Sequence, residues 1–200
     1  MQHEWIDRLD FAKQGGLLPA VVQDARSGRV LMLGYMNREA LEATLRDGKV
    51  TFHSRSKGRL WRKGETSGHE LELVSVEADC DADALLVQAV PQGPTCHLDR
   101  ASCFAAAPAH FLGELDALIG QRARQRPAGS YTTGLLEAGI RRIAQKLGEE
   151  GVETALAALA EDDAALLGEA ADLVYHLLVL LRARGLDLVA LEQTLARRHA

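Results

Sequence analysis

The pattern of apolar residues changes once along this chain, and that change limits the fold to two unlike parts. Up to about residue 104, short runs of aliphatic residues alternate with glycine-containing turns, as in strands joined by turns. From Phe111 onward, apolar residues recur at the three- and four-residue spacing of helices. The segment AAAPAH (105–110) between them has the composition of a linker. We therefore expect two domains, 1–107 and 108–200, which suits a chain of 200 residues.

The first part predicts an α+β domain dominated by a sheet. Strand-like runs at 17–25 and 29–36 flank a Ser-Gly hairpin signal. A helix is expected over 37–48, with Asn37 as its N-cap and a glycine as its stop. Further strand-like runs follow at 51–56, 69–78 and 83–91.

The second part predicts an all-α helical bundle. Gly151 makes an unbroken helix over 131–160 less favourable, so that run is either one helix or two. The segment AEDD (160–163) predicts the turn of a helical hairpin, and Gly185 after two arginines predicts a helix end. The remaining helices are expected near 111–125, 164–184 and 187–198.

Composition and termini exclude several classes of protein. The formal net charge of −5 argues against a general nucleic-acid binder, which usually has a basic excess. The N-terminus MQHEWIDRLDF lacks the apolar core of a signal peptide. The most apolar segment, LVYHLLVLL (173–181), is too short to span a bilayer. We therefore expect a cytoplasmic protein with reduced cysteines and no membrane or nucleic-acid partner.

Three aspartates and a cysteine occupy residues 79–83 (DCDAD), a density of like charge that calls for an explanation. A solvated acidic turn is one. A calcium EF-hand loop is excluded, because its sixth position is Ala84 and its twelfth is Val90 instead of Gly and Glu. If the segment is extended, the aspartates share one face, where their oxygens suit Mg²⁺, and the cysteine faces the other way. The candidate magnesium ligands are Asp79, Asp81 and Asp83.

The chain has three cysteines, Cys80, Cys96 and Cys103, and an odd number cannot all pair internally. Three thiolates with an open position for water make a zinc site of the catalytic kind, whereas a closed site would need a fourth ligand such as His97. The spacing matches no zinc finger, and free cysteines are also common as small buried hydrophobes. These residues alone leave both interpretations open.

The segment SRSKGRLWRKGETSGHE (54–70) combines basic residues, hydroxyls and three glycines. Such a loop can surround a phosphate with charge and hydrogen-bond donors. A mobile basic surface hairpin is the alternative. Trp61 can stack on a base or cap the core.

Three motifs, SRSKGRLWRKGETSGH, DCDADALL and GPTCH…SCF, resemble in this order phosphoribosyl-AMP cyclohydrolase of histidine biosynthesis, over residues 15–104. The resemblance implies zinc held by the three cysteines across a dimer interface, and magnesium held by the three aspartates. It also implies hydrolytic opening of the purine ring between N1 and C6 by water that zinc has acidified. His97, beside a zinc ligand, is the expected proton shuttle, and His69 is a second candidate for that role. The signature of nucleobase deaminases, which attack the same carbon, is absent. The expected substrate contacts are Ser54, Arg55, Trp61, Lys63, Ser67 and His69.

The helical part carries two sets of acids, Glu150 with Glu153 and Glu169 with Asp172. Each set lies on one helix face, and both lie ~12 Å from the expected turn, so an antiparallel hairpin brings them level. Solvent-facing acids are the alternative, but two sets in register favour Mg²⁺ or Mn²⁺. His176, on an apolar stretch, is expected to be a hydrogen-bonded core histidine.

The segments SYTTGLL, KLGEEGVE and EAADLVYHLLVLL resemble phosphoribosyl-ATP pyrophosphohydrolase, one of the MazG-like all-α pyrophosphohydrolases, over residues 111–198. The resemblance implies that magnesium binds the triphosphate and activates water, which releases pyrophosphate. Its implied ligands are Glu149, Glu150, Glu153, Glu169 and Asp172, with Glu150 and Glu153 as catalytic residues. The implied substrate contacts are Ser130, Tyr131, Thr132 and Lys146.

The two resemblances together imply a bifunctional hydrolase, the C-terminal domain making phosphoribosyl-AMP and the N-terminal domain opening its ring. A homodimer that shares its zinc site is expected. The rival hypothesis is a non-catalytic protein in which the cysteines hold a structural zinc and the helices bind a partner.

Overall fold

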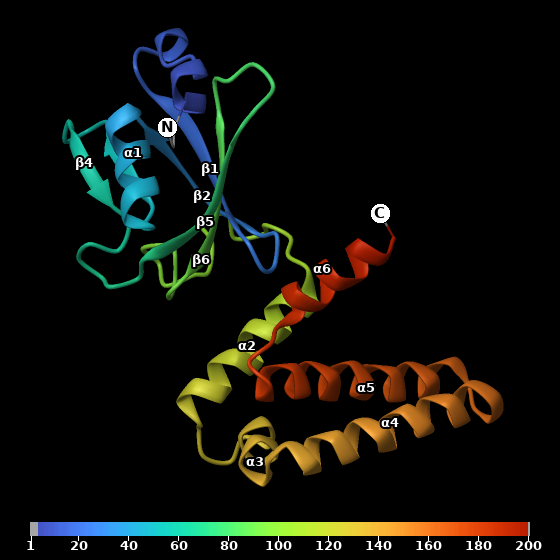
Figure 1. The fold of residues 1–200 in the computed structure, drawn as a ribbon. Coiled ribbons are helices and arrows are strands. Elements are labelled where there is room, and N and C mark those ends of the chain that lie inside the picture. The colour runs from blue at the N-terminus through green and yellow to red at the C-terminus, as the bar shows by residue number, and fades with distance from the viewer. Residues whose placement is uncertain (1–3, 200) are drawn as a thin grey trace. The chain divides into compact units, whose positions relative to one another are not determined.

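The chain forms two compact units, divided between His110 and Phe111, in a computed structural model that describes residues 4–199. The first unit contains all the described strands, and the second contains only helices (Figure 1). This division confirms the predicted fold class of a sheet-dominated α+β part followed by an all-α part.

The N-terminal unit is built on a four-stranded sheet with the strand order β2-β1-β6-β5. β1 and β6 run parallel, whereas β1–β2 and β5–β6 are antiparallel pairs. A second, two-stranded sheet pairs β3 with β4. The strands are β1 (Leu18–Asp24), β2 (Val30–Met36), β3 (Thr51–Ser54), β4 (Arg59–Arg62), β5 (Leu71–Ala78) and β6 (Leu85–Pro91). The helices of this unit are α1 (Arg38–Asp47) and two short 3-10 helices, η1 (Glu4–Arg8) and η2 (Ala12–Gln14).

The core of this unit follows from the alternation of side chains along its strands. Leu18, Ala20 and Val22 of β1 are fully buried, because every second residue of a strand faces the same side. Phe52 of β3 packs against the backbone of β2 at Gly34, where a Cβ would lie 2.4 Å from the phenyl ring. A larger residue at that position would therefore push the β3–β4 sheet off the main sheet.

Two parts of the predicted N-terminal fold are wrong in detail. Residues 54–70 are not one loop: β4 lies inside them and pairs with β3, as in the hairpin alternative, and Trp61 lies opposite Phe52. Residues 79–83 are not extended: they form the turn between β5 and β6, as in the alternative of an acidic turn, with Ala82 at a φ of 61°. That turn is stabilised by the Asp79 carboxylate, whose Oδ1 accepts the backbone N–H groups of Asp83 and Ala84, both at 3.0 Å. The predicted helix with Asn37 as its N-cap is confirmed, since the Asn37 side chain accepts from the Ala40 N–H.

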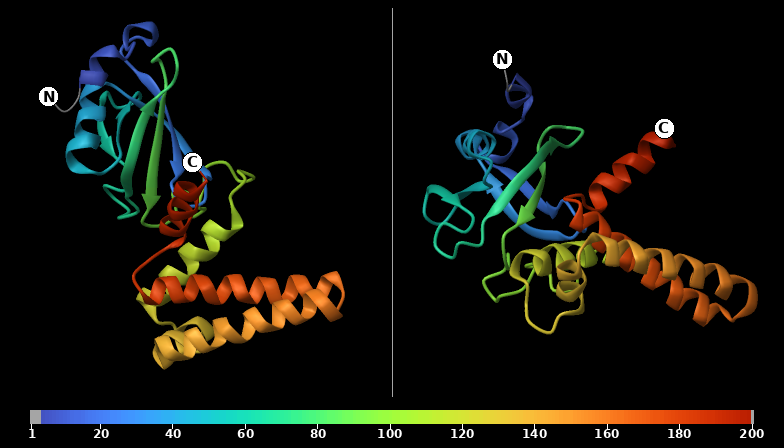
Figure 2. Two further views of the ribbon diagram at one scale, coloured as in Figure 1. Left: turned by 45° about the vertical axis from the view of Figure 1, so that its right-hand side comes forward. Right: turned by 60° about the horizontal axis from the view of Figure 1, so that its bottom comes forward.

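The C-terminal unit is organised around a long antiparallel hairpin of α4 (Ile140–Ala160) and α5 (Asp163–Ala183), as Figures 1 and 2 show. The Asp162 side chain caps α5 by accepting the Ala165 N–H, as helix-starting aspartates commonly do. The other helices are α2 (Phe111–Gln125), α3 (Tyr131–Ala138) and α6 (Leu188–Arg198). The run over 131–160 is interrupted at Gly139, which has a φ of 85°, while α4 continues through Gly151.

Helix α5 is more apolar than the segment 173–181 alone indicates. It has 21 residues, and its most apolar 18-residue stretch has a mean hydropathy of 1.7, so by length and composition it could cross a membrane, contrary to the expectation that the segment is too short. One such helix is weak evidence, because core helices of soluble proteins have the same composition. Only 17% of its most apolar stretch is buried within the chain, which leaves apolar surface open to a further partner.

Helices α2 and α5 are joined by a buried ion pair between Asp116 and Arg182. Asp116 is 1% exposed, and its Oδ1 accepts from the Arg182 Nε at 2.8 Å while its Oδ2 contacts a second guanidinium nitrogen. Asp116→Asn is expected to lower the free energy of unfolding of the helical unit by about 3 kcal/mol, because the arginine would lose its buried counter-charge and keep only Asp187, 3.9 Å from a guanidinium nitrogen. Loss of helical circular dichroism with urea measures this. Asp47→Asn, which removes an exposed pair with Arg46, is the matched control and should change little. Equal stability of the two variants would contradict the prediction.

Candidate active sites

A cavity of about 510 Å³ in the N-terminal unit brings two of the three cysteines together. Cys96 is 5% exposed and Cys103 is exposed, and both lie on the loop that follows β6. That loop is fixed to β2: the Ser102 hydroxyl donates to the Val30 carbonyl at 2.7 Å, and the Cys103 N–H donates to the Leu31 carbonyl at 2.8 Å. The predicted site residues that line this cavity are Trp61, Lys63, Ser67, His69, Cys96, His97 and Cys103.

The two thiols have different electrostatic surroundings. The backbone N–H of Leu98 and then the nearby Arg100 lower the pKa of Cys96, so its thiolate forms readily. Burial and the charge of Cys96 raise the pKa of Cys103. Burial also lowers the pKa of Lys63, although the charges of Cys103 and Cys96 raise it. A cation between the thiols would remove their mutual repulsion, so this donor pair fits a thiophilic metal.

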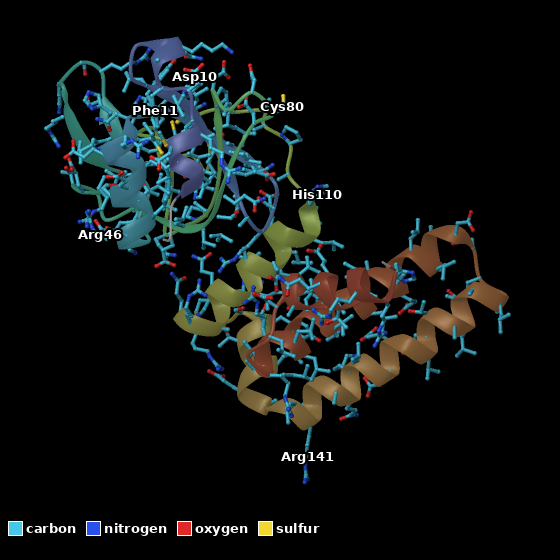
Figure 3. All side chains as sticks on the ribbon, turned by 45° about the horizontal axis from the view of Figure 1, so that its top comes forward. Asp10, Phe11, Arg46, Cys80, His110 and Arg141 are labelled. Carbon is cyan, nitrogen blue, oxygen red and sulfur yellow. The ribbon has the colours of Figure 1, made fainter. Side chains whose placement is uncertain are left out.

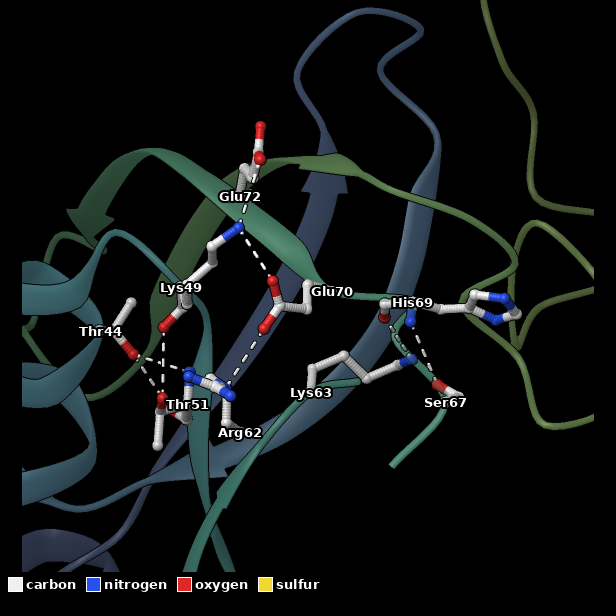
Figure 4. A network of polar contacts seen from close by, with 9 residues as sticks. All are labelled: Thr44, Lys49, Thr51, Arg62, Lys63, Ser67, His69, Glu70 and Glu72. Carbon is white, nitrogen blue, oxygen red and sulfur yellow. Dashed lines mark hydrogen bonds and ion pairs between the residues drawn. The ribbon is translucent and has the colours of Figure 1, made fainter. Parts of the chain in front are cut away.

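His69 lies in the wall of the same cavity, and two glycines make room for it. A Cβ at Gly93 would lie 2.7 Å from the His69 ring, and one at Gly64 would lie 2.6 Å from the His69 backbone. The Lys63 Nζ donates to the His69 carbonyl at 3.2 Å, and the His69 N–H donates to Ser67 Oγ (Figure 4). His97 is exposed beside the thiols, with its Nδ1 4.0 Å from Cys96 Sγ.

Cys80 does not reach this cavity within one chain. It lies in the turn before β6, at an exposed position labelled in Figure 3, whereas Cys96 and Cys103 follow β6. The seven residues of β6 separate the two positions by roughly 23 Å at the usual rise of a strand. Among residues 4–199, neither group of potential metal ligands that converges within 4.8 Å contains a cysteine. Cys80 instead borders another cavity, with apolar residues of β1 and β6.

Asp79, Asp81 and Asp83 do come together, with oxygens within 4.8 Å of one another. An ammonium already lies among them, because the Nζ of Lys13 is 2.8 Å from Asp81 Oδ2 and also contacts Asp83. These contacts raise the pKa of Lys13 and lower that of Asp81. The three carboxylates therefore have the hard oxygen donors that Mg²⁺ takes, with one lysine as counter-ion.

Ser54 and Arg55 lie in a neighbouring cavity of about 570 Å³. It shares Met32 and Trp61 with the cysteine cavity, so the two spaces adjoin. The predicted substrate contacts of the basic segment are thus divided between two adjoining cavities.

In the helical unit, Glu150, Glu169 and Asp172 converge within 4.8 Å across the α4–α5 hairpin. Glu150 is 4% exposed, and its Oε1 is 2.7 Å from the Lys146 Nζ. Burial, followed by the charges of Glu153 and Glu150, raises the pKa of Glu169. Carboxylates that crowd in this way repel one another unless a cation lies between them. Glu149 and Glu153 are not in this group; Glu149 pairs with Lys146 at 3.0 Å.

A chain of hydrogen bonds supports this acidic cluster from the side of α3. His176 is buried, with Nδ1 2.8 Å from the Asp172 carbonyl and Nε2 3.0 Å from the Tyr131 hydroxyl, as expected of a bonded core histidine. The same Nδ1 lies 3.7 Å from Glu150 Oε1. Thr132 is buried between Arg122 and the Tyr175 hydroxyl, and Ser130 caps α3.

Comparison with known proteins agrees with this pair of sites. The family model of phosphoribosyl-AMP cyclohydrolase matches residues 32–105, and that of phosphoribosyl-ATP pyrophosphohydrolase matches residues 112–199. The histidine biosynthesis bifunctional protein HisIE of Xylella fastidiosa strain Temecula1 is 66% identical over 96% of this chain and 93% of its own length. The HisIE of Escherichia coli K12 is 57% identical over 96% of this chain and 95% of its own.

The chain belongs to the HisIE family. It is a bifunctional enzyme with a cyclohydrolase and a pyrophosphohydrolase domain, and membership of the HisIE family implies dependence on metal. The predicted resemblance and enzyme class are confirmed.

Three residues near the N-terminal sites are not indicated by the sequence. Lys13 is distant in sequence from the aspartates that it contacts, and no local pattern connects them. Tyr35 of β2 and His53 of β3 line the second cavity, which only the folded sheets bring together.

Proposed function

We propose that the two units carry out consecutive hydrolyses, the second and third steps of histidine biosynthesis, within domains 1–107 and 108–200. Phosphoribosyl-ATP loses pyrophosphate at the helical unit, and the purine ring of the resulting phosphoribosyl-AMP is opened at the cysteine cavity. The observation that carries the proposal is the pair of separate clusters, thiols in one unit and carboxylates in the other, each of a different metal chemistry.

At the first cluster, Cys96 and Cys103 of one copy would hold Zn²⁺ together with Cys80 of a second copy. The support is geometric: Cys80 is exposed beyond the far end of β6, and among residues 4–199 the two other thiols belong to no group of three converging ligands. A homodimer that shares the site satisfies both facts. The three described thiols are free, as zinc ligands must be.

Bound by Cys96, Cys103 and the second copy's Cys80, zinc would supply a water that is acidic enough to ionise near neutral pH. His97, whose Nδ1 lies 4.0 Å from Cys96 Sγ, would take up the proton of the attacking water and return it to the departing N1. Oxygen adds to C6, the N1–C6 bond breaks, and N1 gains the proton. Trp61, Lys63, Ser67 and His69 form the wall that orients the substrate.

At the second cluster, Glu150, Glu169 and Asp172 would hold Mg²⁺, with Glu149 and Glu153 completing the acidic face. Glu150 and Glu153 are the proposed catalytic carboxylates, which orient water toward the bond between the α- and β-phosphates. Lys146, paired with Glu149 and Glu150, supplies positive charge toward the triphosphate. Ser130, Tyr131 and Thr132 bind substrate or position α3.

A dimer of the helical unit is supported by an apolar stripe on α4. Val152, Leu156 and Leu159 follow one another at helical spacing, and Leu159 is 88% exposed. With the largely unburied α5, this stripe offers the surface that a second copy would cover. We propose a cytoplasmic homodimer.

The test is to supply phosphoribosyl-ATP and Mg²⁺ to the pure protein and follow products by mass spectrometry, with and without zinc removal. Phosphoribosyl-AMP should form in both cases and gain the mass of one water only with zinc. If zinc-loaded protein forms phosphoribosyl-AMP but does not open its ring, only the assignment of the helical unit remains. If phosphoribosyl-ATP is not converted at all, the result favours a structural module.

The aspartate turn is the proposed N-terminal magnesium site, with ligands Asp79, Asp81 and Asp83. Lys13→Gln is expected to tighten Mn²⁺ binding there, roughly three- to tenfold, because a divalent ion no longer has to displace an ammonium. Calorimetric titration in a Glu150→Gln background, which weakens the helical site, measures this. Lys49→Gln, which removes a lysine paired with Glu70 and Glu72, is the matched control. Equal Mn²⁺ affinities of Lys13→Gln and Lys49→Gln would contradict the idea that Lys13 competes with the metal ion.

A further inference from the structure

The second cavity of the N-terminal unit contains an arginine that stacks on a tyrosine and, in the described part of the chain, pairs with no carboxylate. The Arg55 guanidinium carbon lies 3.8 Å from the centre of the Tyr35 ring, so the group stacks on the ring. Within residues 4–199, Arg55 has no ion pair with a carboxylate, whereas Arg59 and Arg62 of β4 pair with Glu65 and Glu70. Stacking leaves the N–H groups of the guanidinium free to bind an anion.

Hydroxyl groups lie next to this arginine at the end of β3. The Ser54 and Ser56 hydroxyl oxygens are 3.4 Å apart, and the Ser54 oxygen accepts the backbone N–H of Lys57 at 3.3 Å. Both serines line the cavity with Arg55. A phosphate has several oxygens that accept hydrogen bonds from different directions, so a guanidinium with hydroxyl groups beside it suits a phosphate.

His53 adds a polar atom that lacks a partner in the described part of the chain. Its Nδ1 is buried and makes no hydrogen bond, although a buried polar atom normally has one. His53 also lines the cavity. A ligand that enters the cavity can therefore satisfy a group that the fold leaves unsatisfied.

The cavity adjoins the cysteine cavity, with which it shares Met32 and Trp61. Trp61 lies against Phe52, with ring centroids 5.7 Å apart, and forms part of the wall between the two spaces. One elongated ligand can thus place a reacting ring near the thiols and an anionic end near Arg55. Phosphoribosyl-AMP has this form, because it carries a phosphate on each of its two riboses.

We propose that Tyr35, His53, Ser54, Arg55 and Ser56 form the binding subsite for one of the two phosphates of phosphoribosyl-AMP. The inference rests on the proposed ring opening at the cysteine cavity. Binding of the distant phosphate fixes the purine relative to the thiols, so loss of this subsite weakens substrate binding more than it slows the bound substrate.

The experiment measures ring opening of phosphoribosyl-AMP by full-length, zinc-loaded Arg55→Gln protein, together with inhibition by ribose 5-phosphate. KM is expected to rise at least tenfold with kcat within threefold of the unchanged protein, and inhibition by ribose 5-phosphate to weaken in parallel. Arg55→Lys keeps the charge but loses the planar stacked group, so its KM should lie between those of the unchanged protein and Arg55→Gln. Lys57→Gln is the matched control, since Lys57 is basic, belongs to the same segment and lines neither cavity.

The outcomes separate this inference from the function on which it rests. A KM within twofold of the unchanged protein for Arg55→Gln, with ring opening intact, would overturn the subsite alone. Failure of the unchanged protein to open the ring would overturn the proposed function. Retention of zinc by Arg55→Gln would show that the N-terminal unit of this variant is folded. If the variant does not retain zinc, the KM of Tyr35→Leu, which removes only the stacking partner of Arg55, tests the subsite instead.

Discussion

Cys103→Ser is expected to abolish ring opening, lowering kcat/KM on the order of 10³-fold or more, while pyrophosphate release stays within a factor of about two. The fall corresponds to about 4 kcal/mol of lost transition-state stabilisation, the scale expected when a metal that activates water is lost. The helical cluster lies in the other unit and shares no residue with the thiols, so its activity should persist. Product analysis by mass spectrometry and measured zinc content check both halves of the expectation.

The matched control for this variant is Leu98→Ala. Leu98 is exposed on the same loop and does not line the cysteine cavity, so its loss should leave zinc and ring opening nearly unchanged. Equal loss of both activities in Cys103→Ser would instead indicate general unfolding.

The sharing of the zinc site can be tested by mixing two inactive variants. Cys80→Ser and Cys103→Ser are each expected to be inactive alone, but a mixed dimer has one intact site, with Cys80 from one copy and Cys96 and Cys103 from the other. Co-expression should restore about one quarter of full ring opening, because about half of random dimers are mixed and each has one of two sites. A site formed within one chain would give no restoration.

Glu150→Gln is expected to have the opposite effect. Pyrophosphate release should fall on the order of 10²- to 10³-fold, because a buried carboxylate at the centre of the acidic cluster would lose the charge that holds magnesium. Ring opening of supplied phosphoribosyl-AMP should remain. Pyrophosphate release is measured with phosphoribosyl-ATP over a range of Mg²⁺ concentrations, where lost ligation appears partly as a higher magnesium requirement.

Two further variants define the acidic site. Glu137→Gln, on an exposed position of α3, is the control and should retain full activity. Glu153→Gln tests whether this residue joins the metal set, since it lies outside the convergent group although its charge raises the pKa of Glu169. Unchanged pyrophosphate release in Glu150→Gln would refute the proposed magnesium site.

Much of this fold could be predicted because its determinants are local. Alternating apolar residues defined the strands of the main sheet, and Asn37 caps α1 as predicted. Helix α5 begins at the end of the predicted turn over 160–163, where Asp162 is its cap. The number of residues between the turn at 160–163 and each acidic set predicted that the two sets lie level in the hairpin. Glu150, Glu169 and Asp172 do converge there.

The errors arise where a contact distant in sequence decides the local structure. Residues 59–62 have a basic, glycine-flanked sequence, and they form β4 because β3 lies beside them. The aspartate turn is folded by a hydrogen-bond pattern that requires Ala82 at a positive φ, which no propensity of alanine indicates.

The separation of Cys80 from the other two thiols could be inferred from the sequence itself. A strand was expected between them, and a strand of that length holds its two ends too far apart for one ion. Lys13, in contrast, could not be assigned to the aspartates, because only the folded N-terminal segment brings it there.

The length of β6 has a consequence for how activity depends on the amount of protein. If each zinc site needs both copies, dilution below the dissociation constant of the dimer removes ring opening and releases metal, even though every chain remains folded. Specific activity would then rise with enzyme concentration, and a defective chain would impair the normal chain with which it pairs.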